Sequence, residues 1–199
     1  MSSPYLDLTL PESAPELTAY GKYYWGDSIF YLYNLVPGVN LEEAAASLQE
    51  EWFEEENETP ILKVAQPEAD FSGKTLSDVI AAHVAADKGV KPRKGKGRDS
   101  KGDIAVYPTA FVVVTKKNWK EDGGLLWVYV MDGKKGKGGK LDKYFFKYDD
   151  AYLLFSGVLF ADYTLNEAKE RFDIEAQHDD EDDDEEEETE EETEEEDDD

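Results

Sequence analysis

The stretch that decides the fold is Ala110–Asp132, with the sequence AFVVVTKKNWKEDGGLLWVYVMD. Two apolar runs, Phe111–Val114 and Leu125–Val130, flank the polar connector Thr115–Gly124. β-Branched and aromatic residues fill both runs, and the connector holds turn residues, which is typical of two strands joined as a hairpin with a long loop. Neither run alternates apolar with polar residues, so both faces of each strand should be covered. This pattern places the pair inside a sheet rather than at its edge.

Two strand–helix units are predicted before the hairpin. Each strand is a short run rich in β-branched, aromatic or aliphatic residues, and each helix follows a capping residue and repeats apolar residues at helical spacing. Turn residues separate the first strand from its helix. In chain order these elements are a strand over Ser28–Val36, a helix over residues 41–56 capped by Asn40, a strand over Pro60–Ala65, and a helix that is capped by Thr75 and ends near Ala86.

Three strands and a last helix account for the rest of the domain. The segment AYLLFSGVLFADY, which follows the last strand, is short and interrupted by a glycine. It therefore predicts a helical turn followed by an irregular apolar segment. The other elements are strands over Asp103–Thr115, with a bend at Pro108, over Leu125–Met131 and over Leu141–Tyr148, and a helix over residues 165–173 capped by a box of Thr164 and Glu167.

The order of these elements is β-α-β-α-β-β-β-α. Because helices separate the first three strands, these strands should lie parallel, and the hairpin then adds antiparallel strands. The sequence therefore predicts an α/β fold, a single domain with a mixed sheet of about five strands and helices packed on it. This domain covers residues 27–174, between an irregular arm over residues 1–26 and a disordered acidic tail over residues 175–199. Aromatic and leucine side chains favour packing of the arm onto the domain, namely Tyr5, Leu8, Tyr23, Tyr24 and Trp25.

Charge is unevenly distributed along the chain, whose net charge is −27. Residues 1–87 have a net charge of −13, residues 88–147 of +10 and residues 148–178 of −5. In the last 21 residues, 19 are Asp or Glu. Such a run repels itself and buries no apolar area, so it should be disordered. A net anion is not expected to bind nucleic acid non-specifically, because phosphate contacts need cations.

The composition excludes several kinds of protein. The chain has no cysteine, which rules out disulfides, thiolate catalysis and Cys-type zinc sites. Its first residues lack a basic segment followed by an apolar run, so they do not form a signal peptide. No stretch approaches the roughly 18 apolar residues that span a bilayer. The prediction is an intracellular protein, cytoplasmic or nuclear, with no membrane partner.

No group of residues predicts a catalytic, cofactor or metal site. His83 lies on the apolar stripe of its helix, which favours a hydrogen-bonded packing role over that of a general base. Ser156 lacks the G-x-S-x-G context of a nucleophile and is interpreted as structural. Asp149 and Asp150 are adjacent, and neighbouring side chains on an extended chain point apart. A helix-cap or turn role is therefore favoured over acid–base catalysis for this pair.

Two glycine-rich basic loops, Lys88–Gly102 and Asp132–Lys140, form a candidate binding surface. Neither contains a phosphate-binding G-x-x-x-x-G-K-[ST] motif, and the first precedes a strand rather than a helix. The run KPRKGKGR fits nuclear import or nucleic-acid contact, but no aromatic residue lies within it to stack on bases. We expect the acidic tail to cover both loops transiently at low salt. The candidate basic patch consists of Lys91, Arg93, Lys94, Lys96, Arg98, Lys101, Lys134, Lys135, Lys137 and Lys140.

Several stretches resemble an uncharacterised family of small α/β domains, a domain of unknown function found in bacteria and fungi. The similar stretches are LYNLVPGVNLEEAAASL, ADFSGKTLSDVIAAH, FVVVTKKNWKEDGGLLWVYV and KYFFKYDDAYLLFSGVLFADYTLNEA, and the likeness covers roughly residues 28–173. Both basic loops, the arm and the tail are additions to this pattern. The apolar AYLLFSGVLF also replaces a polar, Asn-rich segment of the family. The resemblance implies the α/β architecture and no activity.

Three functions fit these observations. The first is a non-enzymatic protein-interaction module whose acidic tail engages basic proteins. The second is an enzyme or small-ligand binder with its site at the carboxyl ends of the parallel strands, near Val36–Asn40 and Ala65–Asp70. The third is a polyanion binder that works through Lys91–Lys101 and Lys134–Lys143. A concave site with convergent polar groups at the strand ends would favour the second function.

Overall fold

The computed structural model describes residues 6–12, 29–89, 109–131 and 140–175. Most of the arm, most of both basic loops and all of the acidic tail except Glu175 lie outside these residues. In chain order the elements are β1 (Phe30–Asn34), α1 (Leu41–Leu48), α2 (Glu50–Glu54), β2 (Leu62–Val64), α3 (Leu76–Gly89), β3 (Ala110–Val114), β4 (Leu125–Val130), β5 (Leu141–Phe146), the 3-10 turn η2 (Tyr148–Asp150), α4 (Ala151–Leu159) and α5 (Leu165–Phe172).

The five strands form one mixed sheet in the order β2-β1-β3-β4-β5. Strand β1 pairs in parallel with β2 on one side and with β3 on the other. Strands β3, β4 and β5 pair antiparallel in succession. The predicted α/β fold, with parallel strands first and an antiparallel hairpin added, is therefore confirmed.

The hairpin strands β3 and β4 lie inside the sheet, as their unbroken apolar runs predict. Every residue of β3 is buried, and only Val130 of β4 is partly exposed. The two strands pair from Ala110 opposite Tyr129 to Val114 opposite Leu125. Their connector closes with a backbone hydrogen bond of 2.8 Å from the Thr115 N–H to the Gly124 carbonyl. The pair forms the buried centre of the domain.

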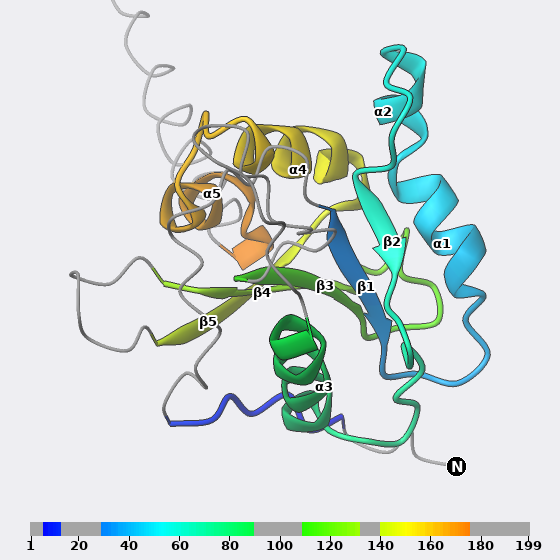
Figure 1. The fold of residues 1–199 in the computed structure, drawn as a ribbon, viewed down its shortest axis with the longest axis vertical. Coiled ribbons are helices and arrows are strands. Elements are labelled where there is room, and N and C mark those ends of the chain that lie inside the picture. Colours follow the sequence, from blue (N-terminus) through cyan, green and yellow to red (C-terminus); the bar gives the residue numbers. More distant parts are fainter. Residues whose placement is uncertain (1–5, 13–28, 90–108, 132–139, 176–199) are drawn as a thin grey trace, which may run out of the picture.

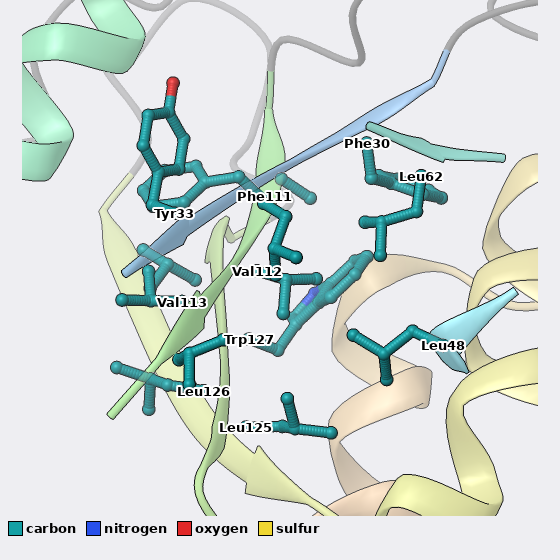
Figure 2. Packing of buried hydrophobic residues seen from close by; sticks show 14 of the residues in the cluster. Phe30, Tyr33, Leu48, Leu62, Phe111, Val112, Val113, Leu125, Leu126 and Trp127 are labelled. Atoms are coloured by element: carbon teal, nitrogen blue, oxygen red, sulfur yellow. The ribbon is translucent and has the colours of Figure 1, made fainter. Parts of the chain in front are cut away.

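Helices cover both faces of the sheet (Figure 1). Helix α3 and the described part of the arm lie against one face, which presents Tyr33 and Phe111; α1, α4 and α5 cover the other. On that second face Trp127 packs edge-on to Phe30, with ring centroids 5.0 Å apart, and stacks on Phe155 of α4 at 5.8 Å. Figure 2 shows Trp127 beside Phe30, Leu62 and Leu48, and Tyr33 with Phe111 on the opposite side.

The first predicted helix is broken, which corrects the continuous helix predicted for residues 41–56. Asn40 caps α1 as predicted, accepting a hydrogen bond of 3.3 Å from the Glu43 N–H. Helix α1 ends at Leu48, and the next residue, Gln49, has a φ of −124°, outside the helical range. The Gln49 side-chain oxygen accepts hydrogen bonds from the N–H groups of Ile61 and Leu62, at 3.2 and 3.3 Å. The Gln49 side chain thus satisfies two backbone donors at the start of β2, and a second short helix, α2, begins at the next residue.

The apolar segment after β5 is also more regular than predicted. Instead of a helical turn and an irregular stretch, residues 151–159 form the continuous helix α4. The glycine that argued against a helix is accommodated because the Tyr163 ring packs where a side chain at Gly157 would lie. The predicted box of Thr164 and Glu167 caps α5, with both reciprocal hydrogen bonds present.

Part of the N-terminal arm packs on the domain. The Asp7 carbonyl accepts a hydrogen bond of 2.9 Å from the N–H of Leu76, at the start of α3, and the Leu8 carbonyl accepts one of 2.6 Å from Lys143 Nζ of β5. The side chains of Leu6, Leu8 and Leu10 pack against the core. The predicted packing of Leu8 is therefore confirmed, and the arm's aromatic residues lie outside the described residues.

No helix in the described part of the chain is both long enough and apolar enough to cross a bilayer.

Candidate functional site

The order of the parallel strands reverses at β1. The chain moves from β1 through α1 to β2 on one side, and then through α3 to β3 on the other side of β1. The two connecting helices cover opposite faces of the sheet, so they diverge at the carboxyl ends of β1 and β3 (Figure 1). In open α/β sheets such a reversal leaves a crevice, and ligands bind there.

A pocket of about 740 Å³ lies at this reversal, and we call it the switch-point pocket. Three segments that follow strand ends supply most of its lining. The residues are Leu35, Val36 and Pro37 after β1, Ser72, Gly73 and Lys74 before α3, and Thr115, Lys116, Lys117, Asn118 and Asp122 after β3, with Leu6 from the arm. The lining thus combines an apolar wall with lysines, hydroxyls and an amide.

A hydrogen-bonded cluster around Asn34 holds two of these segments together. Asn34 ends β1 and is 1% exposed. Its Nδ2 donates to the Val36 carbonyl at 2.6 Å, to Asp70 Oδ1 at 3.0 Å and to Ser72 Oγ at 3.3 Å, and its Oδ1 accepts from the Val36 N–H at 3.0 Å. This side chain therefore fixes the turn after β1 against the segment that leads into α3.

Asp70 is the charged member of this cluster. It accepts hydrogen bonds from the Ser72 hydroxyl at 2.5 Å and from the Ser72 N–H at 3.0 Å. The pKa of the Asp70 carboxyl is held below its ordinary value, chiefly by the hydrogen bond from the Ser72 hydroxyl. The Ser72 N–H, the Asn34 amide and the charge of Lys74 lower it further. The carboxylate is thus engaged in structure, and it positions the Ser72 hydroxyl beside the pocket.

The lysines of the pocket differ in how their charges are compensated. Lys74 pairs with Glu68 at 3.2 Å, with both side chains about half exposed. Lys116 Nζ donates to the Asp122 backbone carbonyl, a neutral partner that leaves its charge uncompensated. Lys117 is exposed and makes no hydrogen bond or ion pair with another described residue. Lys116 and Lys117 therefore bring two uncompensated positive charges to the switch-point pocket.

A second hollow of about 400 Å³ lies on the other side of the β3–β4 connector, toward α1. It shares Lys117 and Asn118 with the switch-point pocket and reaches Gly38, Val39 and Asn40 at the start of α1. The buried Trp119 ring lines it, with Lys120 Nζ 5.4 Å from the ring centroid. The connector thus separates two concave surfaces at the reversal of strand order.

The predicted basic patch falls almost entirely outside the described residues. Of its ten members only Lys140 is described, and it is exposed just before β5. The other nine are Lys91, Arg93, Lys94, Lys96, Arg98, Lys101, Lys134, Lys135 and Lys137.

The histidine and serine considered for catalysis are built into the core. His83 is fully buried on α3, where its Nδ1 lies 3.1 Å from the Tyr33 hydroxyl and its ring lies 4.4 Å from that of Phe111. The Ser156 hydroxyl donates to the Tyr152 carbonyl at 2.6 Å, one turn earlier in α4. The predicted packing role of His83 and structural role of Ser156 are therefore confirmed.

The acidic pair Asp149–Asp150 lies in the 3-10 turn η2. Asp150 occupies the N-cap position of α4, but its side chain makes no capping hydrogen bond. The predicted turn position is confirmed, whereas a capping interaction is absent among the described residues. Among all the residues that the structure describes, no three His, Asp or Glu side chains lie close enough to hold a metal ion.

The pocket includes Val36 and Pro37 from the first of the two predicted ranges, Val36–Asn40, whereas no residue of the second, Ala65–Asp70, lines it. That a ligand binds there stays a prediction, and the polar residues of the lining were not named in it. Thr115, Lys116 and Lys117 were assigned only to a hairpin connector, and Ser72 only to a turn. The signal that identifies them is positional, because each lies just after a parallel strand or before the next crossover helix.

Searches with protein-family models, among curated proteins and among solved structures found no match to this chain. The resemblance to a family of small α/β domains therefore stays a prediction.

Proposed function

We propose that this domain binds a small anionic molecule with an apolar portion in the switch-point pocket. The observation that carries the proposal is the coincidence of a concave site with the reversal of strand order between β1 and β3. Sites for small molecules commonly enclose about 300–1,000 Å³, and this pocket has about 740 Å³. Its position and size both fit a ligand site.

The charge of the lining supports an anionic ligand. Lys116 and Lys117 bring two uncompensated positive charges to the pocket, and Asp122 is the one acidic residue in the described lining. A carboxylate or phosphate that accepts hydrogen bonds from ammonium groups gains more than it would from neutral donors. The Ser72 and Thr115 hydroxyls and the Asn118 amide can complete its coordination.

The apolar wall supports a ligand with a hydrocarbon or ring portion. Leu6, Leu35, Val36 and Pro37 supply the apolar part of the pocket lining. Burying apolar area against such a wall contributes about 25 cal/mol per Å². The ligand class is therefore an amphiphilic carboxylate or phosphate monoester rather than an inorganic ion.

Binding is favoured over catalysis at this site. The Ser72 hydroxyl donates to a carboxylate whose pKa lies below its ordinary value, so Asp70 is a poor acceptor for the hydroxyl proton. His83 is fully buried, bonded to Tyr33, and does not line the pocket. We therefore propose a ligand-binding domain and assign no nucleophile or general base.

The interaction-module function is a second candidate, resting on the sequence of the tail. Nineteen acidic residues in the last 21 would attract basic proteins by charge. Such partners would be available to a cytoplasmic or nuclear protein, which is the location we propose.

Titration calorimetry with hexanoate and phenyl phosphate tests the proposed function, with hexanol and hexylamine as neutral and cationic counterparts. We expect the two anions to bind. The double variant Lys116→Gln/Lys117→Gln should weaken their binding at least tenfold, roughly 1.4 kcal/mol. The matched control is Lys63→Gln/Lys140→Gln, which removes two exposed lysines away from the pocket. Equal binding of hexanol and hexanoate, or equal loss in the control, would refute the proposal.

A further inference from the structure

Exposed apolar side chains gather on two neighbouring helices. Of the four large apolar residues with high exposure in the described chain, three belong to α2, to α4 or to the residue that follows α4: Phe53 at 43%, Leu153 at 47% and Phe160 at 60%. The fourth, Met131, follows β4 at 37%. Single exposed apolar residues are normal, but a concentration of them marks an interaction surface.

Helix α4 is apolar on both sides, and the described residues cover one side more fully than the other. Leu154, Phe155 and Val158 are buried against the sheet. Leu153 and Phe160 are seven residues apart, two helical turns, so they share the outer side of α4. A helix that is apolar all round is normally buried all round. Among the described residues, the outer side of α4 therefore lacks the cover that its composition implies.

Trp52 joins this side of α4 to α2. Its ring stacks on Phe160, with centroids 5.9 Å apart and planes at 29°, and lies 6.5 Å from Tyr152. Figure 1 shows α2 and α4 at the same end of the molecule. We call the surface formed by Phe53, Tyr152, Leu153 and Phe160, beside the buried Trp52 ring, the α2–α4 patch.

A groove continues this surface along α1 and α2. It has a volume of about 530 Å³ and is lined by Ala46, Ser47, Glu50, Phe53 and Glu54. The Ser47 carbonyl at its edge accepts a hydrogen bond of 3.2 Å from the Tyr148 hydroxyl, just before α4. The groove offers room for an apolar side chain beside Phe53.

Exposed acidic side chains lie on α2 and directly after it, on the same short segment as Phe53. Glutamates 50, 51, 54, 55 and 56 are all exposed, and none pairs with a cation of another described residue. Two copies of this face would bring ten such carboxylates together, and like charges across an interface cost several kcal/mol. The same repulsion disfavours anionic lipid and nucleic acid. The chain's own basic run at residues 91–102 lacks large apolar residues to fill the patch.

We propose that the α2–α4 patch docks a basic amphipathic helix of a partner protein. Apolar residues at helical spacing on that helix would cover Phe160, Leu153 and the groove, in the manner of helix-in-groove recognition. Its Lys and Arg residues would face the glutamates of α2. This surface is separate from the switch-point pocket, so the two proposals stand or fall independently.

The test uses the full chain and an 18-residue peptide of Leu and Lys with Leu at helical spacing. A scrambled peptide of the same composition accounts for charge-only binding to the acidic tail. We expect Leu153→Ser/Phe160→Ser to weaken the ordered peptide about tenfold and to abolish its advantage over the scrambled one. The matched control, Met131→Ser, removes an exposed apolar residue elsewhere and should leave binding unchanged.

A second variant and a second measurement keep the test independent of folding. Glu50→Gln/Glu54→Gln/Glu55→Gln keeps the apolar patch and should weaken the ordered peptide several-fold at low salt. In the wild-type chain, the peptide should shift the amide resonances of α2 and α4 more than those of α3. Unchanged affinity in either patch variant, or a wild-type dimer that Phe160→Ser converts to monomer, would overturn the proposal.

Discussion

The interior of the sheet and its carboxyl-end rim are built in contrasting ways. The interior, β3 and β4, is apolar on both faces and continuous in sequence apart from one connector. The rim, residues 34–37, 70–74 and 115–118, mixes polar with apolar residues and comes from three distant segments. The interior contributes stability through burial, whereas the rim positions hydrogen-bonding groups around a pocket. Substitutions should separate these two contributions.

The largest expected effect is the loss of the Trp127 side chain in the interior. Trp127 is fully buried between Phe30 and Phe155, so Trp127→Ala should cost about 3–5 kcal/mol of unfolding free energy. Its Nε1 has no hydrogen-bond partner among the described residues, so Trp127→Phe sacrifices no hydrogen bond and should cost much less. Urea unfolding followed by circular dichroism measures both, with Met131→Ala as the control. Equal costs for Ala and Phe would contradict this account of the interior.

A smaller effect is expected where interior and rim meet. Asn34→Ala removes four hydrogen bonds from a buried position and leaves the Val36 N–H without its side-chain acceptor. The cost should be about 1–3 kcal/mol. Unlike Trp127→Ala, Asn34→Ala should also weaken the binding of ligands in the switch-point pocket, because Asn34 fixes two segments of that pocket. The exposed Asn118→Ala is the control for stability, which should stay within about 0.5 kcal/mol of wild type.

The smallest effect is the pH dependence that Asp70 gives to the rim. Because the folded state lowers the pKa of this carboxyl below 3.8, its contribution to stability is full above about pH 4 and falls as the pH drops through the folded-state pKa. The unfolding free energy of Asp70→Asn should therefore fall less steeply than that of the wild type as the pH drops from about 5 to about 2.5. Asp149→Asn, which changes an exposed carboxylate of η2, should keep the wild-type slope. If the unfolding free energy of Asp70→Asn and that of the wild type changed with pH at the same slope, the hydrogen bonds of the cluster would not stabilise the charged Asp70 carboxylate.

Most of the interior could be predicted from local patterns. The unbroken apolar runs around the connector indicated two buried central strands, and the capping residues Asn40 and Thr164 located two helix starts correctly. The predictions failed where a distant partner overrode the local pattern. Gln49 leaves the helix to bind backbone donors near β2, and Gly157 is tolerated in α4 because Tyr163 packs against it.

Less of the rim could be predicted. The strand-end rule indicated its location, but no local pattern distinguishes Lys116 and Lys117 from the lysines of a solvated turn. Ser72 likewise has the composition of an ordinary turn residue. Their roles depend on which segments lie beside them, and that depends on the order of strands in the sheet.

The amino-acid sequence by itself determined the buried hairpin, the parallel start of the sheet and the segregation of charge, because strand propensity, capping and charge are properties of neighbouring residues. Tertiary structure alone decided the pocket and the uncovered side of α4. The pocket requires residues 34–37, 70–74 and 115–118 to meet, and the exposure of Leu153 and Phe160 depends on how far Trp52 and the sheet extend over α4. Both depend on contacts between segments that are distant in the chain, so no window of sequence contains them.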